Sequence, residues 1–226
     1  LLYGRTIAFP FLNWDDPEFV LNIPQLRTPR WADLPSLFRP WDVPGRYLYL
    51  PITYLSHLIE AALFGLDARV FHATNVLLHL SNVLLAYRLI RELREPVWVA
   101  LIVAMAFAAH PLQVEAVAWV SARKDLLATM FALAAVLGYL RGMRDRRPAM
   151  LLTTLACFTL SALSKPAALL LPVFFLVLEW SESGRLCRTD FLRQIPLMLV
   201  AAGVWLINHR LPVPDPVHPY HFWYRW

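Results

Sequence analysis

The chain has 226 residues, of which 58% are hydrophobic and only 16% are charged, and its formal net charge is +5. A soluble domain typically carries about 25% charged and roughly 45–50% apolar residues, so this composition excludes a disordered protein and disfavours an ordinary soluble enzyme. Because the apolar residues occur in blocks and the mean hydropathy is +0.49, we predict an all-α fold, a polytopic transmembrane helical bundle.

We expect residues 1–69 to form a first extracytoplasmic loop rather than to cross the membrane. Within this loop, residues 52–66 place apolar side chains at helical spacing on one face, while Thr53, His57 and Glu60 lie on the other. This two-faced pattern is typical of a helix that lies in the membrane interface. A short spanning helix is the alternative.

Six apolar stretches follow, and we expect them to form a transmembrane bundle over residues 70–209. They are residues 70–90, 97–109, 125–141, 149–163, 166–180 and 195–209. Several are shorter than the ~20 residues of a perpendicular span. Flanking tryptophans such as Trp98, Trp119 and Trp180 can extend them into the membrane interface.

The linkers between these stretches alternate in charge. The first, third and fifth linkers together hold ten cations, namely Arg88, Arg91, Arg94, Arg141, Arg144, Arg146, Arg147, Arg185, Arg188 and Arg193. The second and fourth hold three, namely Arg123, Lys124 and Lys165. Short loops rich in Lys and Arg remain in the cytoplasm. The even linkers, the first loop and the tail at residues 210–226 are therefore expected to share the non-cytoplasmic face.

Asp15 and Asp16 are adjacent carboxylates in the first loop. Asp-Asp-Pro is a good helix start, with Pro17 at the first helical position, so capping is one interpretation. The other is an acid–base or metal-binding carboxylate at the membrane surface. Binding of a divalent metal ion by the two adjacent carboxylates is therefore an open alternative, although the sequence shows no typical spacing of metal ligands.

The second linker is dense in ionisable groups, from His110 to Asp125. Helical spacing would place Glu115, Trp119 and Arg123 on one face. One interpretation is interface anchoring, with Arg123 and Lys124 pairing with Glu115 and Asp125. The alternative is a pocket in which cations receive a phosphate and carboxylates orient a hydroxyl group.

Two further candidates lie near the same face. Lys165 either reaches to the interface or supplies a point charge for a lipid-linked phosphate. His72 lies nearest the outer surface in a polar stripe that also contains Asn75, His79 and Asn82, for which interhelical hydrogen bonding is the main expectation.

Several classes of site are excluded by composition. Cys157 lies in an apolar block and Cys187 in a basic linker, so no disulfide scaffold is expected. The seven glycines form no phosphate-binding loop, and we expect no nucleotide cofactor. The grouping of cations beside apolar blocks indicates membrane orientation rather than a nucleic-acid partner.

Seven segments resemble the membrane part of bacterial tetratricopeptide-repeat proteins of the GT-C glycosyltransferase type, which are similar to the transmembrane O-mannosyltransferases that act on cadherins. The segments are NWDDPEF (13–19), YLPITYLSH (49–57), FGLD (64–67), HATNVLLH (72–79), HPLQVEAVAW (110–119), RKD (123–125) and LSKP (163–166). The resemblance runs from about residue 9 to residue 180. Gln113 departs from the family, which usually has His there. Since residue 1 is Leu and no repeat pattern occurs, we expect a fragment of a longer protein.

The resemblance implies a GT-C fold, a polyprenyl-phosphate-linked sugar as donor, and a multi-pass protein of a bacterial inner membrane. It implies that an acidic residue of the first outer loop is the general base, and Asp15 matches that position best, followed by Asp16. Binding of donor phosphate or acceptor is implied for His110, Glu115, Arg123, Lys124 and Lys165.

We therefore expect a glycosyltransferase that moves a mannose-like sugar from a polyprenyl-phosphate carrier to a protein hydroxyl outside the cytoplasm. The reaction needs a carboxylate that deprotonates the hydroxyl group and cations that hold charge on the departing phosphate. A transporter or flippase is one alternative, although transporters carry charges or helix breaks within their spans. A membrane anchor for a repeat domain is the other.

Overall fold

The computed structural model describes residues 2–40, 48–145 and 148–211, and these residues form helices without β-strands. The α-helices are α1 (Pro24–Arg27), α2 (Leu34–Leu37), α3 (Pro51–Phe64), α4 (Ala68–Glu92), α5 (Val97–Ala109), α6 (Gln113–Ala118), α7 (Arg123–Asp145), α8 (Pro148–Ser164), α9 (Leu171–Ser183) and α10 (Arg188–Arg210). Short 3₁₀ turns occupy Gly4–Ala8, Trp31–Asp33, Val120–Ala122 and Pro166–Leu170, and one π-helical turn occupies Pro17–Leu21. The all-α fold class is thus confirmed, whereas most of the predicted tail, residues 212–226, lies outside the described residues.

The six predicted membrane stretches correspond to α4, α5, α7, α8, α9 and α10. The stretch at 166–180 begins as a 3₁₀ turn, and α9 continues from Leu171. Helix α10 begins seven residues earlier than expected, at Arg188, because the Asp190 carboxylate accepts a hydrogen bond of 2.7 Å from the Cys187 backbone N–H and caps the helix.

Among the described residues, three helices are long and apolar enough to cross a membrane, judged by length and composition: Ala68–Glu92, Val120–Arg144 and Arg188–Arg210. The shorter apolar helices are Val97–Ala109, Ala149–Ser164 and Pro166–Ser181. Large apolar side chains point away from the protein on several of these helices, among them Ile102, Met105, Val177, Leu199 and Trp205. Such extensive exposed apolar surface suits contact with lipid.

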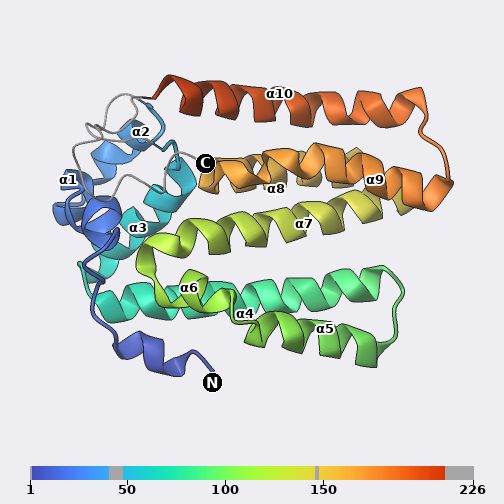
Figure 1. Cartoon of the computed structure of the whole chain (residues 1–226). Helices are drawn as coiled ribbons and strands as arrows, with labels where there is room; N and C mark the ends of the chain where they lie inside the picture. Colours follow the sequence, from blue (N-terminus) through green and yellow to red (C-terminus); the bar gives the residue numbers. More distant parts are fainter. Residues whose placement is uncertain (1, 41–47, 146–147, 212–226) are drawn as a thin grey trace.

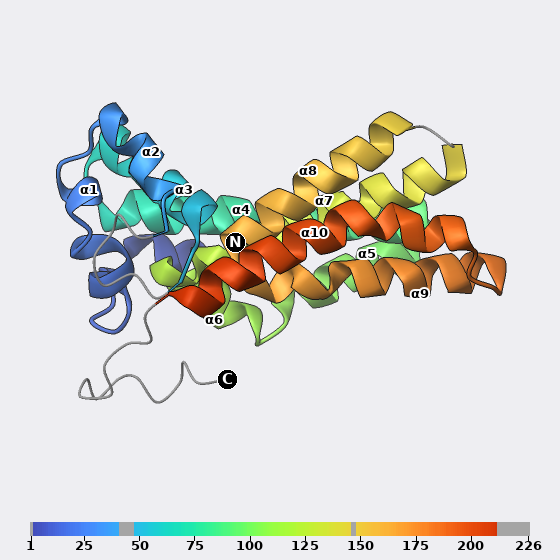
Figure 2. The ribbon, with the colours of Figure 1, turned by 90° about the horizontal axis from the view of Figure 1, so that it is seen from above.

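The long helices run side by side, so their connections gather at two ends (Figure 1). The α4–α5 and α9–α10 connections, the end of α7 and the start of α8 lie at one end, on the right of Figure 1, and we call it the arginine end. The opposite end carries α1, α2, α3 and the α6–α7 junction, and we call it the polar-motif end. Figure 2 shows the same separation from above. The alternating linkers of the sequence therefore lie on opposite ends of the bundle.

Helix α3 buries its polar side and exposes part of its apolar side. His57 and Glu60 are buried, whereas Ile59, Leu63 and Phe64 are exposed. The Thr53 hydroxyl donates to the Ser164 carbonyl oxygen at 3.1 Å, which ties α3 to the end of α8. This orientation is the reverse of a soluble amphipathic helix and fits an outer face in contact with lipid.

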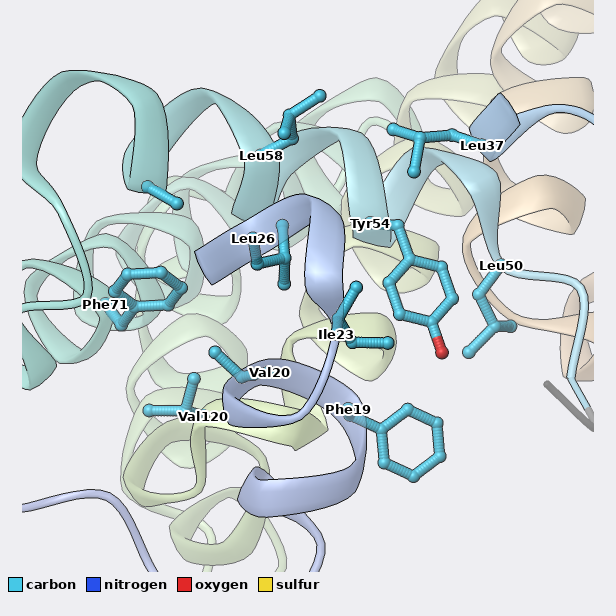
Figure 3. Packing of buried hydrophobic residues seen from close by; sticks show 11 residues of the cluster. Phe19, Val20, Ile23, Leu26, Leu37, Leu50, Tyr54, Leu58, Phe71 and Val120 are labelled. Carbon is cyan, nitrogen blue, oxygen red and sulfur yellow. The ribbon is translucent and has the colours of Figure 1, made fainter. Parts of the chain in front are cut away.

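The polar-motif end has its own hydrophobic cluster, shown in Figure 3. Its members come from the first loop, α3, α4 and the α6–α7 junction: Phe19, Val20, Ile23, Leu26, Leu37, Leu50, Tyr54, Leu58, Ala61, Phe71 and Val120. Burial of these side chains fixes the first loop against the membrane helices. Asp15 and Asp16, which directly precede this cluster, are thereby held at a defined place.

Candidate functional site

The carboxylate of Asp16 joins the first loop to the α6–α7 junction. Its Oδ2 accepts a hydrogen bond of 2.8 Å from the Leu12 backbone N–H, and its Oδ1 accepts one of 2.9 Å from the Ser121 backbone N–H. Asp16 is completely buried. A short helical turn does begin at Pro17 as expected, but Asp16 makes no side-chain cap bond to it. The capping interpretation of Asp16 is therefore wrong, since both oxygens bind backbone elsewhere.

The α6–α7 junction interrupts the predicted helical face. Helix α6 ends at Ala118, and Trp119 is extended, with φ −106° and ψ 122°. The Asn75 side-chain amide donates to the freed Trp119 carbonyl oxygen at 2.9 Å, and Asp16 binds the Ser121 N–H. The break leaves these backbone groups without helical hydrogen bonds. Because the buried Asn75 and Asp16 side chains bind them instead, the break is stable here. The prediction that Glu115, Trp119 and Arg123 share one face was wrong.

Arg123 is buried with no exposed surface and all of its side-chain nitrogens bind protein groups. Its Nε donates to Asn75 Oδ1 at 2.9 Å, and Nη2 donates to the Phe71 carbonyl oxygen at 2.8 Å. Nη1 forms an ion pair with Glu60. The expected pairing of Arg123 with Glu115 or Asp125 was therefore wrong, because Glu60 of α3 supplies the partner.

His57 lies beside this ion pair and stacks on Phe71, with ring centroids 5.5 Å apart. Both ring nitrogens are buried without a hydrogen-bond partner. Burial, followed by the charges of Arg123 and Lys124, holds the pKa of His57 well below its ordinary value of 6.5. The folded state thus favours the neutral imidazole.

We expect His57→Phe to make the protein less sensitive to acid. Because the folded state favours the neutral ring, the contribution of His57 to stability is complete above the ordinary pKa, begins to decline near about pH 6.5, and is lost as the pH falls through the lowered pKa. Thermal unfolding of both proteins in detergent, at about pH 7.5 and about pH 5.5, measures the difference. An equal loss of stability in both proteins would contradict this role.

In the polar stripe on α4, His79 and Asn82 form the expected hydrogen bonds to other helices, whereas His72 contacts the first loop. The Nε2 atoms of His72 and His79 lie 3.4 Å from the Pro10 carbonyl oxygen and 3.2 Å from that of Ala108. The Asn82 amide donates to the Leu126 carbonyl oxygen at 3.0 Å. These contacts confirm the structural expectation for the stripe. His72 is completely buried between the first loop and α4.

A cavity of about 310 Å³ opens beside the junction. Its lining includes Glu115 from α6, Asp125 from α7 and Lys165 from the α8–α9 connection, with Gln113 and Thr129 as further polar groups. Lys165 Nζ forms an ion pair with Asp125, and each side chain remains about one-third exposed, at 35% and 37%. The cavity therefore presents a cation and two carboxylates to a ligand.

Lys124 connects this cavity to the first loop. Its ammonium group lies 4.5 Å from the centre of the Phe19 ring. It also interacts electrostatically with Asp125, Asp15 and Asp16, and with Lys165. Asp15 is 8% exposed. Segments separated by about 150 residues thus place four carboxylates around one region, together with the ammonium groups of Lys124 and Lys165.

Four further predicted site residues do not line this cavity. Asp15 does not line the 310 Å³ cavity, although Lys124 is its electrostatic neighbour. His110 is exposed before α6, where its Nδ1 accepts a hydrogen bond of 3.2 Å from the Leu112 N–H. His72 and Arg123 are buried and do not face the cavity.

Asp125 and Glu60 are not among the site residues that the sequence predicts. Asp125 follows Lys124 directly, and Glu60 lies on the polar face of residues 52–66, so their positions carried a signal. Their partners Lys165 and Arg123 are distant in sequence, and only folding identifies them. Across the described residues, no group of three or more His, Cys, Asp or Glu side chains could hold a metal ion.

The chain is similar to known mannosyltransferases. The family described as dolichyl-phosphate-mannose-protein mannosyltransferase matches residues 51–208. Protein O-mannosyl-transferase TMTC1 of Mus musculus is 35% identical over 152 residues, which cover 63% of this chain and 16% of the relative. Protein O-mannosyl-transferase F38B6.6 of Caenorhabditis elegans is 30% identical over 159 residues, or 69% of this chain and 22% of the relative. The chain thus spans about a fifth or less of these relatives, and no solved structure matches it.

Proposed function

Because the chain belongs to the dolichyl-phosphate-mannose-protein mannosyltransferase family, we propose that it forms the membrane part of a GT-C-type enzyme. This enzyme transfers a mannose-like sugar from a polyprenyl-phosphate carrier to a hydroxyl group of a protein. The observation that carries the proposal is the cavity lined by Glu115, Asp125 and Lys165, with Lys124 and Asp15 beside it.

The active face is the polar-motif end, and we assign it to the non-cytoplasmic side of the membrane. The described parts of the arginine-rich linkers lie at the other end of the bundle (Figure 1). Cytoplasmic loops carry the excess of Lys and Arg, so this asymmetry supports the assignment. A carrier with its polyprenyl chain in the bilayer can present its phosphate at the membrane surface, next to the cavity. By its bacterial resemblance, the protein belongs to an inner membrane.

The transfer is a single displacement at the sugar's anomeric carbon. The acceptor oxygen forms a bond to this carbon, the bond between carbon and phosphate oxygen breaks, and the phosphate leaves with the electron pair. Asp15 takes the proton of the acceptor hydroxyl as general base. Lys165 and Lys124 stabilise the negative charge that develops on the phosphate, while Glu115 orients the acceptor.

The buried residues act by positioning these groups. Asp16 holds the first loop on the α6–α7 junction through Leu12 and Ser121. Arg123 supports the same junction from the α3 and α4 side. Asp15 and Lys124 are the direct neighbours of these two anchors, so their positions depend on them.

A transfer assay tests the proposed function. Membranes that contain the intact protein are incubated with radiolabelled polyprenyl-phosphate sugars and an acceptor protein. We expect label to enter the protein fraction from polyprenyl-phosphate mannose, and not from a nucleotide-linked mannose supplied alone to washed membranes. Absence of transfer from every lipid-linked sugar, with the protein correctly inserted, would contradict the proposal.

We expect Lys165→Ala to raise the KM for the lipid-linked donor by about tenfold, because it removes a cation that faces the cavity. Its partial exposure limits the effect of the lost charge. Lys165→Arg should restore much of the affinity. Arg69→Ala is the matched control. Arg69 is an exposed cation near the start of α4, and it is not part of the cavity lining. Superimposable donor titrations for Lys165→Ala and the unaltered protein would remove Lys165 from phosphate binding.

A further inference from the structure

A second cavity of about 550 Å³ is lined by residues of the arginine end. This end lies opposite the polar-motif end, which holds the proposed transfer site (Figure 1). Its charged lining consists of Arg94, Arg144, Arg193 and Glu179. These residues come from the α4–α5 connection, the end of α7, the start of α10 and the end of α9. Ligand pockets commonly have volumes of 300–1,000 Å³, so the space suits a small headgroup.

The cations of this cavity exceed the carboxylates that face them. Glu179 Oε1 accepts hydrogen bonds from the Tyr139 hydroxyl at 2.9 Å and from Arg193 Nη1 at 3.1 Å. Arg144 pairs with Glu92 at 3.0 Å, and Glu92 also binds Arg141 at 2.8 Å. Arg193 also lies 3.8 Å from Asp190. The nearby carboxylates are therefore already paired with Arg141, Arg144 and Arg193, which leaves Arg94 as the excess positive charge of the lining.

Arg94 is the uncommitted cation of this cavity. Its side chain is exposed and, across the described residues, makes no hydrogen bond or ion pair. Its backbone has φ 66°, and no other described non-glycine residue has positive φ. A left-handed conformation favours glycine and is uncommon for a residue with a side chain. This conformation ends α4 directly after its C-cap residue, Leu93, and leaves the exposed Arg94 side chain in the lining of the cavity.

The rest of the lining is apolar and includes Leu93, Leu140 and Met143. The cavity thus combines guanidinium groups with an aliphatic wall at the end of the membrane helices. Guanidinium groups bind phosphate oxygens in bidentate geometry. Basic pockets between transmembrane helices on the cytoplasmic side are known to bind anionic lipid headgroups.

We propose that this cavity binds a phosphate-bearing anion, and its setting at the membrane boundary favours the headgroup of an anionic phospholipid. Arg94, Arg144 and Arg193 contact the phosphate, and the leucine and methionine side chains contact the glycerol and the first acyl methylenes. This site is separate from the one that accepts the sugar donor.

The test measures binding to the intact protein in detergent micelles, by native mass spectrometry and by the shift of the thermal midpoint. Three probes are compared: dioleoylphosphatidylglycerol, dioleoylglycerol with the same acyl chains but no phosphate, and inorganic phosphate. We expect saturable binding of the phosphatidylglycerol and none of the dioleoylglycerol. Arg94→Gln should weaken the phosphatidylglycerol affinity about tenfold.

Two further variants make the result specific. Arg94→Gly fits the left-handed backbone without a penalty and should fold at least as well, yet it should lose affinity to the same extent. Arg88→Gln removes an exposed cation of α4 that is not part of the cavity lining and should bind as the unaltered protein does. If inorganic phosphate competes at similar affinity, the phosphate site stands but its natural ligand is a soluble phosphate compound. Equal phosphatidylglycerol affinity in Arg94→Gln, Arg94→Gly and the unaltered protein would overturn the proposal.

Discussion

Replacing Asp15 with Asn is expected to lower the rate of sugar transfer by about 10²–10⁴-fold, because the amide cannot accept the proton of the acceptor hydroxyl. The substitution keeps the size of the side chain, so insertion and folding should persist. Transfer from a polyprenyl-phosphate donor in membranes measures the rate, and thermal unfolding in detergent measures the fold. We expect a loss in kcat with little change in the KM for the donor.

Neighbouring carboxylates supply the controls for Asp15. Glu18 is exposed one helical turn away, and Glu18→Gln should leave transfer unchanged. Asp16→Asn should reduce both activity and stability, since one of its two side-chain oxygens becomes an amide nitrogen that cannot accept the N–H of Leu12 or Ser121. An unchanged rate in Asp15→Asn would remove Asp15 from the role of general base. A rate loss confined to Asp16→Asn, at unchanged stability, would transfer that role to Asp16.

Arg123→Met is expected to destabilise the protein by about 3–5 kcal/mol, because it leaves the buried carboxylate of Glu60 without its cation. Asn75 Oδ1 and the Phe71 carbonyl oxygen also lose their donors. Urea or thermal unfolding of the detergent-solubilised protein measures the change. Transfer activity should fall with it, since the junction that carries Lys124 loses its support.

A double variant separates the ion pair from general packing. Glu60→Leu combined with Arg123→Met removes both charges, and we expect it to be more stable than Arg123→Met alone, because no uncompensated charge remains buried. As a control, Arg69→Met removes an exposed cation near the start of α4, at the polar-motif end, and should change stability little. A loss below about 1 kcal/mol in Arg123→Met would contradict the central role of the ion pair.

The two ends of the bundle carry different kinds of charged groups. The polar-motif end places carboxylates next to ammonium groups around a cavity, which suits proton transfer and stabilisation of a leaving phosphate. The arginine end carries guanidinium groups, which suit permanent positive charge at a membrane boundary. Charges gathered at the helix ends also distinguish this chain from transporters, whose functional charges commonly lie within their spans.

Local patterns in the sequence determined most of the secondary structure and the general placement of the polar groups. The helix at Val97–Ala109 coincides with its predicted stretch, and α3 begins one residue before the predicted segment. The stripe through His79 and Asn82 indicated interhelical hydrogen bonds, and both side chains make them. Hydrophobic length and helical periodicity are properties of neighbouring residues, so they can be read without knowledge of the fold.

Only the tertiary structure decided which charged groups pair and where the chain breaks. Lys165 has no acidic neighbour in sequence, yet it pairs with Asp125, and Arg123 pairs with Glu60 from a separate helix. The break at Trp119 is stable because Asn75 satisfies its carbonyl oxygen from α4. A buried charge or an open backbone group is stable only next to its partner, and helix packing, rather than local spacing, brings such partners together.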